Sequence, residues 1–91
     1  MTPEYTYIAV RAVTNAEMLK LESTSTDRSI RFTINYARCQ YGARIGRQIA
    51  GLILAGYSVT TTRGDGFFVD GRYAKVLCSG QRAHELIFCT E

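Results

Sequence analysis

The sequence predicts an α+β fold in which an antiparallel sheet of about five to six strands packs on a single helix. In the N-terminal third, apolar and polar residues alternate with the period of half-buried strands. The segment from Arg38 to Gly56 is instead apolar and glycine-spaced, with the period of a helix. After Gly56, runs of β-branched and aromatic residues are separated by glycine turns. The predicted order is therefore a β-meander, one long central helix and a second β-meander.

The first meander is predicted from three alternating runs, Tyr5–Val13, Met18–Thr24 and Ser29–Tyr36. If a hairpin closes at Thr26-Asp27, Leu21 lies opposite Phe32, and the large aliphatic side chains of both strands share one face. A shift of one residue would scatter this apolar set over both faces. The shared face therefore favours strands.

A short helix over residues 15–22 is the competing interpretation of the second run. Thr14 and Glu17 have the spacing of a capping box, in which each side chain accepts a hydrogen bond from the other residue's backbone N–H. This signal is local, whereas the common apolar face links three runs, so strands remain the prediction.

The central helix is predicted from apolar residues at helical spacing, namely Ile45, Ile49, Leu52 and Ile53. Gly56 then supplies a C-terminal cap. Gly42, Gly46 and Ala50 lie four residues apart, and glycine lowers helix propensity. Their spacing predicts a close approach of the helix backbone to the sheet or to a second chain.

The second meander is predicted from four runs, Tyr57–Thr62, Phe67–Val69, Arg72–Cys78 and Ala83–Cys89. Asp70-Gly71 between apolar residues is a strong hairpin signal, and Gly64-Asp65-Gly66 suits a short loop with positive φ. The C-terminal half is thus expected to be almost entirely β-structure.

One small domain over residues 1–91 is expected, because the chain has 91 residues, of which 46% are hydrophobic. Met1–Glu4 contains no cationic stretch leading into an apolar one, as a secretion signal would. The longest apolar run, Ile49–Ala55, is far shorter than the roughly 20 residues of a membrane span. A cytoplasmic protein without membrane contact is predicted.

No catalytic residue, metal ligand or cofactor is assigned from the sequence. Cys39, Cys78 and Cys89 are odd in number and match no zinc spacing, so reduced buried thiols are expected. His84 has no nucleophile motif near it. A non-enzymatic protein is predicted, with a small ribonuclease using Arg72, Tyr73 and His84 as a minor alternative.

Arginine dominates the positive charge, with nine Arg and two Lys against eight Asp and Glu, a net charge of +3. The predicted outer face of the first meander mixes tyrosines with cations. The candidate partner-binding residues are Tyr5, Tyr7, Arg11, Lys20 and Arg31 on that face, with Arg44 and Arg47 on the flank of the central helix.

A protein partner is the favoured target, because +3 is a weak charge for purely electrostatic binding. The expected role is an inhibitor or adaptor of the kind that phages and mobile elements encode, directed for example at a host defence or nucleic-acid-processing complex. Direct nucleic-acid binding through an Arg/Tyr sheet face is the alternative. The expected state is a monomer or a homodimer.

Overall fold

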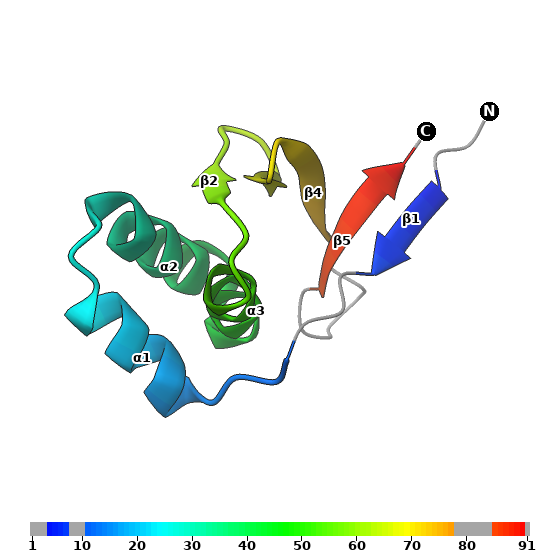
Figure 1. The fold of residues 1–91 in the computed structure, drawn as a ribbon. Helices are drawn as coiled ribbons and strands as arrows, with labels where there is room; N and C mark the ends of the chain where they lie inside the picture. Colours follow the sequence, from blue (N-terminus) through cyan, green and yellow to red (C-terminus); the bar gives the residue numbers. More distant parts are fainter. Residues whose placement is uncertain (1–3, 8–10, 78–84, 91) are drawn as a thin grey trace.

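The structure, a computed structural model, describes residues 4–7, 11–77 and 85–90, with side chains for residues 11–76. Within this part the helices lie together on one side and the strands on the other (Figure 1). The elements follow the order β1 (Glu4–Tyr7), α1 (Asn15–Thr24), α2 (Arg28–Tyr41), α3 (Ala43–Leu54), β2 (Val59–Thr61), β3 (Gly66–Val69), β4 (Arg72–Leu77) and β5 (Glu85–Thr90).

The predicted fold is wrong: helices stand in place of the second and third strands of the first meander. Of the predicted strand Tyr5–Val13, residues 5–7 lie in β1, whereas residues 11–13 belong to no strand. The runs Met18–Thr24 and Ser29–Tyr36 lie in α1 and α2, so the described residues form three helices where one was predicted. Apolar residues two apart also fit a helix when only some of them point inward. Ile34 is fully buried on α2, whereas Phe32 is 59% exposed.

The start of α1 contains the capping box of Thr14 and Glu17, the signal of the competing helix interpretation. The Thr14 hydroxyl accepts a hydrogen bond from the Glu17 N–H at 3.1 Å, and the Glu17 carboxylate accepts one from the Thr14 N–H at 3.2 Å. Two N–H groups that a helix start leaves unpaired are thereby satisfied. The capping box therefore predicts this helix correctly, whereas the alternation of apolar residues does not.

Gly42 divides the predicted helix from Arg38 to Gly56 into the end of α2 and all of α3. Its backbone, with φ 97° and ψ 172°, lies in a region that only glycine adopts readily. The two helices can therefore change direction across a single residue. At the other end of α2, the Asp27 carboxylate caps the helix by accepting from the Ser29 N–H at 2.8 Å.

The sheet has the order β1-β5-β4-β3-β2 in the described residues, and every neighbouring pair is antiparallel. The hairpin predicted at Asp70-Gly71 is present, with φ of 49° and 84° at these residues. Positive φ at both turn positions matches the twist of the flanking strands. The described strands of the second half are thus found where the alternation predicted them. The positive φ predicted for the loop Gly64-Asp65-Gly66 is wrong, because none of these residues has one.

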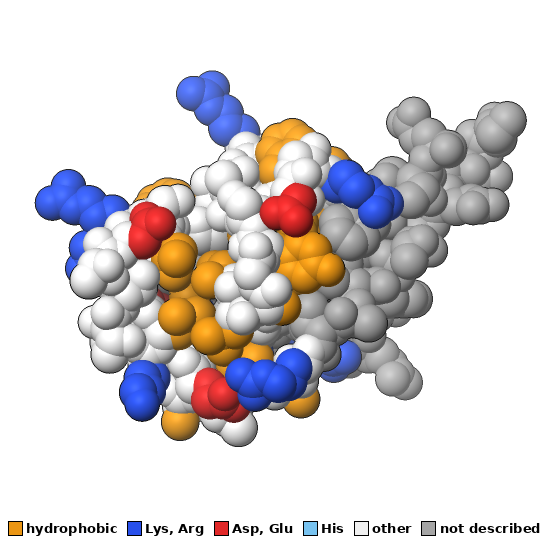
Figure 2. Space-filling model, in the orientation of Figure 1, with side chains coloured by type: hydrophobic (Ala, Val, Ile, Leu, Met, Phe, Trp, Pro, Cys, Tyr) orange, Lys and Arg blue, Asp and Glu red, His pale blue; other side chains and the backbone are white. Residues whose placement is uncertain are grey.

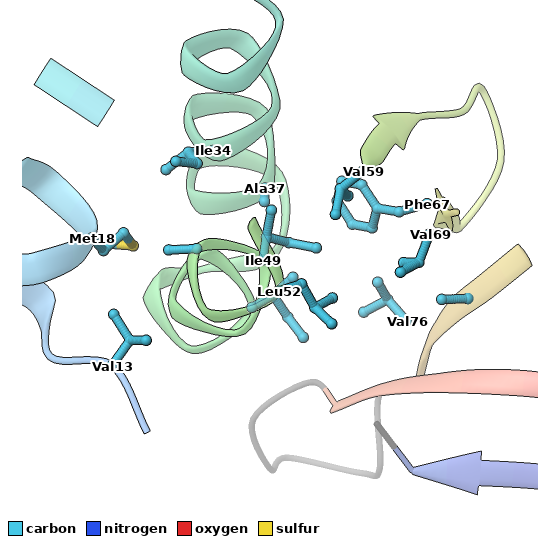
Figure 3. Packing of buried hydrophobic residues seen from close by; sticks show 13 residues of the cluster. Val13, Met18, Ile34, Ala37, Ile49, Leu52, Val59, Phe67, Val69 and Val76 are labelled. Carbon is cyan, nitrogen blue, oxygen red and sulfur yellow. The ribbon is translucent and has the colours of Figure 1, made fainter. Parts of the chain in front are cut away.

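The core lies between α3 and the inner face of the sheet, where Ile49 and Leu52 meet Phe67 and Val69 (Figure 3). On the opposite side of α3, the helix packs against α1 and α2. A Cβ added at Gly46 would lie 2.7 Å from the Met18 sulfur. The close approach predicted at Gly46 is therefore to the other helices, not to the sheet.

None of the described helices combines the length and the apolar character that a bilayer crossing needs.

Candidate functional site

The predicted binding residues do not share one sheet face. Arg11 precedes α1, Lys20 lies in α1 and Arg31 lies in α2, so the common strand face predicted for these cations is absent. Tyr5 and Tyr7 belong to β1, but their side chains lie outside the described part of the chain.

Two of these cations do come together beside α1. Arg11 and Lys20 line a hollow of about 320 Å³ whose other lining residues include Leu21 and Leu54. The Arg11 guanidinium also forms an ion pair with Glu17 at 3.0 Å, with both side chains largely exposed. The charge of Arg11 is therefore partly engaged within the chain, and an exposed pair of this kind adds little stability.

Arg44 and Arg47 both lie on α3, but their surroundings differ. Arg47 donates a hydrogen bond to the side-chain oxygen of Asn15 at 2.7 Å, which ties α3 to the first turn of α1. Arg44 is exposed in the first turn of α3. A structural role therefore accounts for Arg47.

The solvent-facing side of α2 gathers cationic, aromatic and amide side chains. Arg28, Arg31, Phe32 and Asn35 follow the helical spacing of one face and line a shallow hollow of about 400 Å³ together with Glu22. We call these four residues of α2 the α2 patch. Figure 2 shows hydrophobic side chains gathered over the helices, with Lys and Arg side chains at the margin.

Phe32 is the most exposed of the large hydrophobic residues in the described part, at 59%. Its ring stacks on Tyr36, with the centroids 6.0 Å apart and the planes 26° from parallel. Tyr36 in turn contacts the core ring of Phe67 edge to face. The Phe32 ring is therefore held in place by its contact with Tyr36. Because its rotamers are already restricted, less side-chain entropy is lost on binding.

Glu22, which lines the same hollow, forms an ion pair between α1 and α2. The Nη2 of Arg38 donates to the two Glu22 carboxylate oxygens at 3.0 and 3.1 Å, and its Nε donates to one of them at 3.4 Å. The Arg38 and Glu22 side chains are 32% and 21% exposed. This pair neutralises the carboxylate that lines the hollow and ties α1 to α2.

The described region carries a surplus of positive charge, with ten Lys and Arg against five Asp and Glu between residues 11 and 77. Arg28 and Arg31 form no ion pair with the described residues. Every carboxylate of this region, by contrast, accepts from a donor of its own chain: Glu17, Glu22, Asp27, Asp65 and Asp70. The α2 patch is thus open to an anionic partner.

A second group of polar and aromatic side chains lies on the side of β3 and β4 away from the helices. The Tyr73 hydroxyl donates a hydrogen bond to one oxygen of Asp65, and the Lys75 ammonium lies 3.5 Å from the other. The Phe68 and Tyr73 rings meet edge to face with centroids 5.7 Å apart. We call Asp65, Phe68, Tyr73 and Lys75 the sheet cluster.

The contacts within the sheet cluster shift two pKa values. Burial, followed by the hydrogen bond to Asp65, raises the pKa of Tyr73 to about 12. The hydrogen bond from Tyr73, with a smaller effect of Lys75, lowers the pKa of Asp65 below its ordinary value. Near neutral pH, Tyr73 is therefore a neutral donor and Asp65 an ionised acceptor.

The described residues do not test the minor ribonuclease hypothesis, because one of its three residues lies outside them. Arg72 and Tyr73 are neighbours on β4, and His84 lies outside the described part. Cys39 is an exposed free thiol on α2, whereas Cys78 and the side chain of Cys89 also fall outside. In the part described, no three His, Cys, Asp or Glu side chains gather as metal ligands would.

Sequence reasoning missed Phe32 and Phe68 as surface residues. The strand prediction points Phe32 inward, although Arg28 four residues before it and Asn35 three residues after it place it on a polar face if the run is a helix. Phe68 follows another phenylalanine. Because adjacent strand residues face opposite sides of a sheet, one of the two rings must lie on the outer face, and this is the signal for Phe68 in the sequence.

The chain matches no protein-family model, no curated protein and no solved structure, so the functional inference rests on its surfaces.

Proposed function

We propose that this protein is a small non-enzymatic binding module that acts on a protein partner through the α2 patch. The observation that carries the proposal is the exposure of Phe32 beside Arg28 and Arg31 on one helix face. Aromatic and arginine side chains dominate the binding energy of protein interfaces, because they offer large contact areas and directional hydrogen bonds.

The proposed partner surface is acidic with an apolar element. Arg28 and Arg31 can each take a carboxylate in a bidentate geometry, while the hollow beside Phe32 accommodates a hydrophobic side chain. Asn35 adds an amide that donates and accepts at the rim. A compact scaffold with such a patch suits an inhibitor or an adaptor, which needs a surface rather than an active site.

The first prediction concerns Phe32→Ala, which should weaken partner binding at least about tenfold while lowering the melting temperature only slightly. The ring is exposed, so its removal costs the fold little. We would immobilise the wild type and the variant, capture proteins from a lysate of the encoding organism, and titrate the partner by calorimetry. Phe68→Ala, on the other side of the molecule, is the matched control.

Charge reversal gives the second arm of the same experiment. Arg31→Glu should abolish the interaction, whereas Lys20→Glu makes an equal charge change on exposed α1 and should leave most of it. A captured partner that binds Phe32→Ala and Arg31→Glu as tightly as the wild type would overturn the proposal.

A further inference from the structure

Among the described side chains, β3 and β4 present one face that the helices do not cover. Along β3, Phe67 and Val69 are buried against the helices, while Phe68 between them is 42% exposed. Along β4, Tyr73 and Lys75 alternate with the buried Ala74 and so share the face of Phe68. This exposed face carries the sheet cluster.

The two aromatic rings of the cluster occupy adjacent central strands. Phe68 and Tyr73 are direct cross-strand partners in the β3–β4 register. Their edge-to-face contact leaves the Phe68 ring open to solvent. An exposed aromatic pair in the middle of an uncovered antiparallel sheet is a surface on which flat, unpaired bases can stack.

Asp65 holds the polar side chains of the cluster in place. It accepts from the Tyr73 hydroxyl and pairs with Lys75, so neither side chain needs to be ordered by a ligand. The same loop, between β2 and β3, carries Arg63, which is exposed and forms no ion pair with the described residues.

The net positive charge of the described region as a whole fits a polyanion, and around the cluster itself Arg63, Arg72 and Lys75 stand against Asp65 and Asp70. The surplus of ten cations over five carboxylates between residues 11 and 77 creates a field that attracts phosphates. The strand register also aligns Gly66, Lys75, Ile87 and Tyr7 in one row, so the row that contains Lys75 runs across four strands. A row of this length spans several nucleotides of an extended strand.

We infer that the uncovered sheet face binds single-stranded nucleic acid, with bases stacking on Phe68 and Tyr73 and phosphates contacting Lys75 and Arg63. This function goes beyond the protein partner of α2 and uses the other side of the molecule. Bases in a duplex already stack on one another and present only their edges, so a flat aromatic face favours single strands.

Phe68→Ala tests the stacking contact. We would titrate fluorescein-labelled oligothymidylate and oligouridylate with the full chain and follow fluorescence anisotropy at low and physiological salt. The wild type should bind both, and Phe68→Ala should bind roughly 5- to 150-fold more weakly. Phe68→Leu, which keeps apolar volume without a ring, should lose a similar amount, whereas Phe32→Ala on α2 should bind as the wild type.

Asp65→Asn tests the electrostatics with the opposite sign. Asparagine still accepts from Tyr73 but releases Lys75 from its ion pair, so binding should tighten severalfold at low salt, and this gain should shrink as salt rises. Asp27→Asn makes the same charge change at the N-cap of α2, where asparagine also caps well, and should have little effect.

Three results would overturn the inference. The first is that the wild-type protein binds neither oligonucleotide at low salt. The second is that the Phe68→Ala and Phe68→Leu proteins bind as tightly as the wild type. The third is that the wild type binds duplex DNA, or polyglutamate of matched charge, with equal affinity. A failure here leaves the α2 patch untouched, because Phe32→Ala is assayed against a protein partner and Phe68→Ala is its control.

Discussion

At the scale of single residues, Asp65 shows how one carboxylate organises an exposed surface. Its two oxygens engage Tyr73 and Lys75 from one side of the β3–β4 hairpin. Because Tyr73 contributes most to lowering the pKa of Asp65, this hydroxyl is the group whose removal reports on the contact.

Tyr73→Phe should raise the pKa of Asp65 toward its ordinary value, as measured by NMR titration of the side-chain carboxyl carbon. Since the folded pKa lies below the unfolded value of about 3.9, the contact stabilises the fold above that pH and ceases to do so as pH falls through the folded pKa. Any difference in melting temperature between the two proteins should therefore shrink in acid.

Tyr57→Phe is the control for this titration, because Tyr57 is an exposed tyrosine on the segment before β2. It should leave the Asp65 titration unchanged. An identical Asp65 midpoint in wild type and Tyr73→Phe would show that the hydroxyl does not bind the carboxylate in solution.

At the scale of elements, Gly42 separates two helices that the periodicity of the sequence joins. Its φ of 97° with ψ near 172° is strained for any other residue, and a Cβ there would meet no atom within 4 Å. The cost of a side chain at this position therefore comes from the backbone alone.

Gly42→Ala should lower the free energy of unfolding by about 1–3 kcal/mol, measured by urea denaturation followed by circular dichroism. Gly64→Ala is the matched control, because a Cβ at Gly64 makes only ordinary contacts at 3.5 Å and its φ is not positive. Equal stability of both variants would mean that α2 and α3 do not turn through this backbone conformation.

The predictable elements are those whose signals are local and unambiguous. Asp70-Gly71 predicted its hairpin because only a narrow set of residues tolerates positive φ at both positions. The alternation of Phe32 with Ile34, by contrast, is compatible with a strand and with a helix that exposes one of them. The capping box of Thr14 and Glu17 is the local signal that predicts α1. For α2 the corresponding signal is Asp27, whose side chain caps the helix.

The candidate surfaces were less predictable than the strands, because exposure depends on packing between distant segments. Arg31 is predicted on the outer face of a strand, and it lies instead on α2, where it lines the hollow beside Phe32. Phe32 could not be placed outside without knowing that its run is helical, and Phe68 became a surface residue only through the burial of Phe67 and Val69.

At the scale of the whole molecule, Gly46 is the point where the helical layer closes. A Cβ there would lie 2.7 Å from the Met18 sulfur of α1 and 3.2 Å from the Arg38 Cβ of α2. Three helices therefore depend on the absence of a side chain at one residue of α3.

Gly46→Leu should destabilise the protein by about 1–3 kcal/mol, because the added atoms force α1 and α2 apart. Ala43→Leu, an exposed change on the same helix, is the control and should alter the midpoint of thermal unfolding little. A Gly46→Leu protein with the wild-type midpoint would show that α3 does not approach its neighbours this closely.

The pairing of β1 with β5 has a kinetic consequence. This ladder joins Glu4 to Thr90, whereas the hairpin of β3 and β4 joins residues only a few positions apart. Loop-closure entropy grows with the length of chain enclosed, and contacts between distant segments slow folding. We therefore expect β1 to pair with the sheet last during folding. We also expect its separation from β5 to be the local opening of the native state with the lowest barrier.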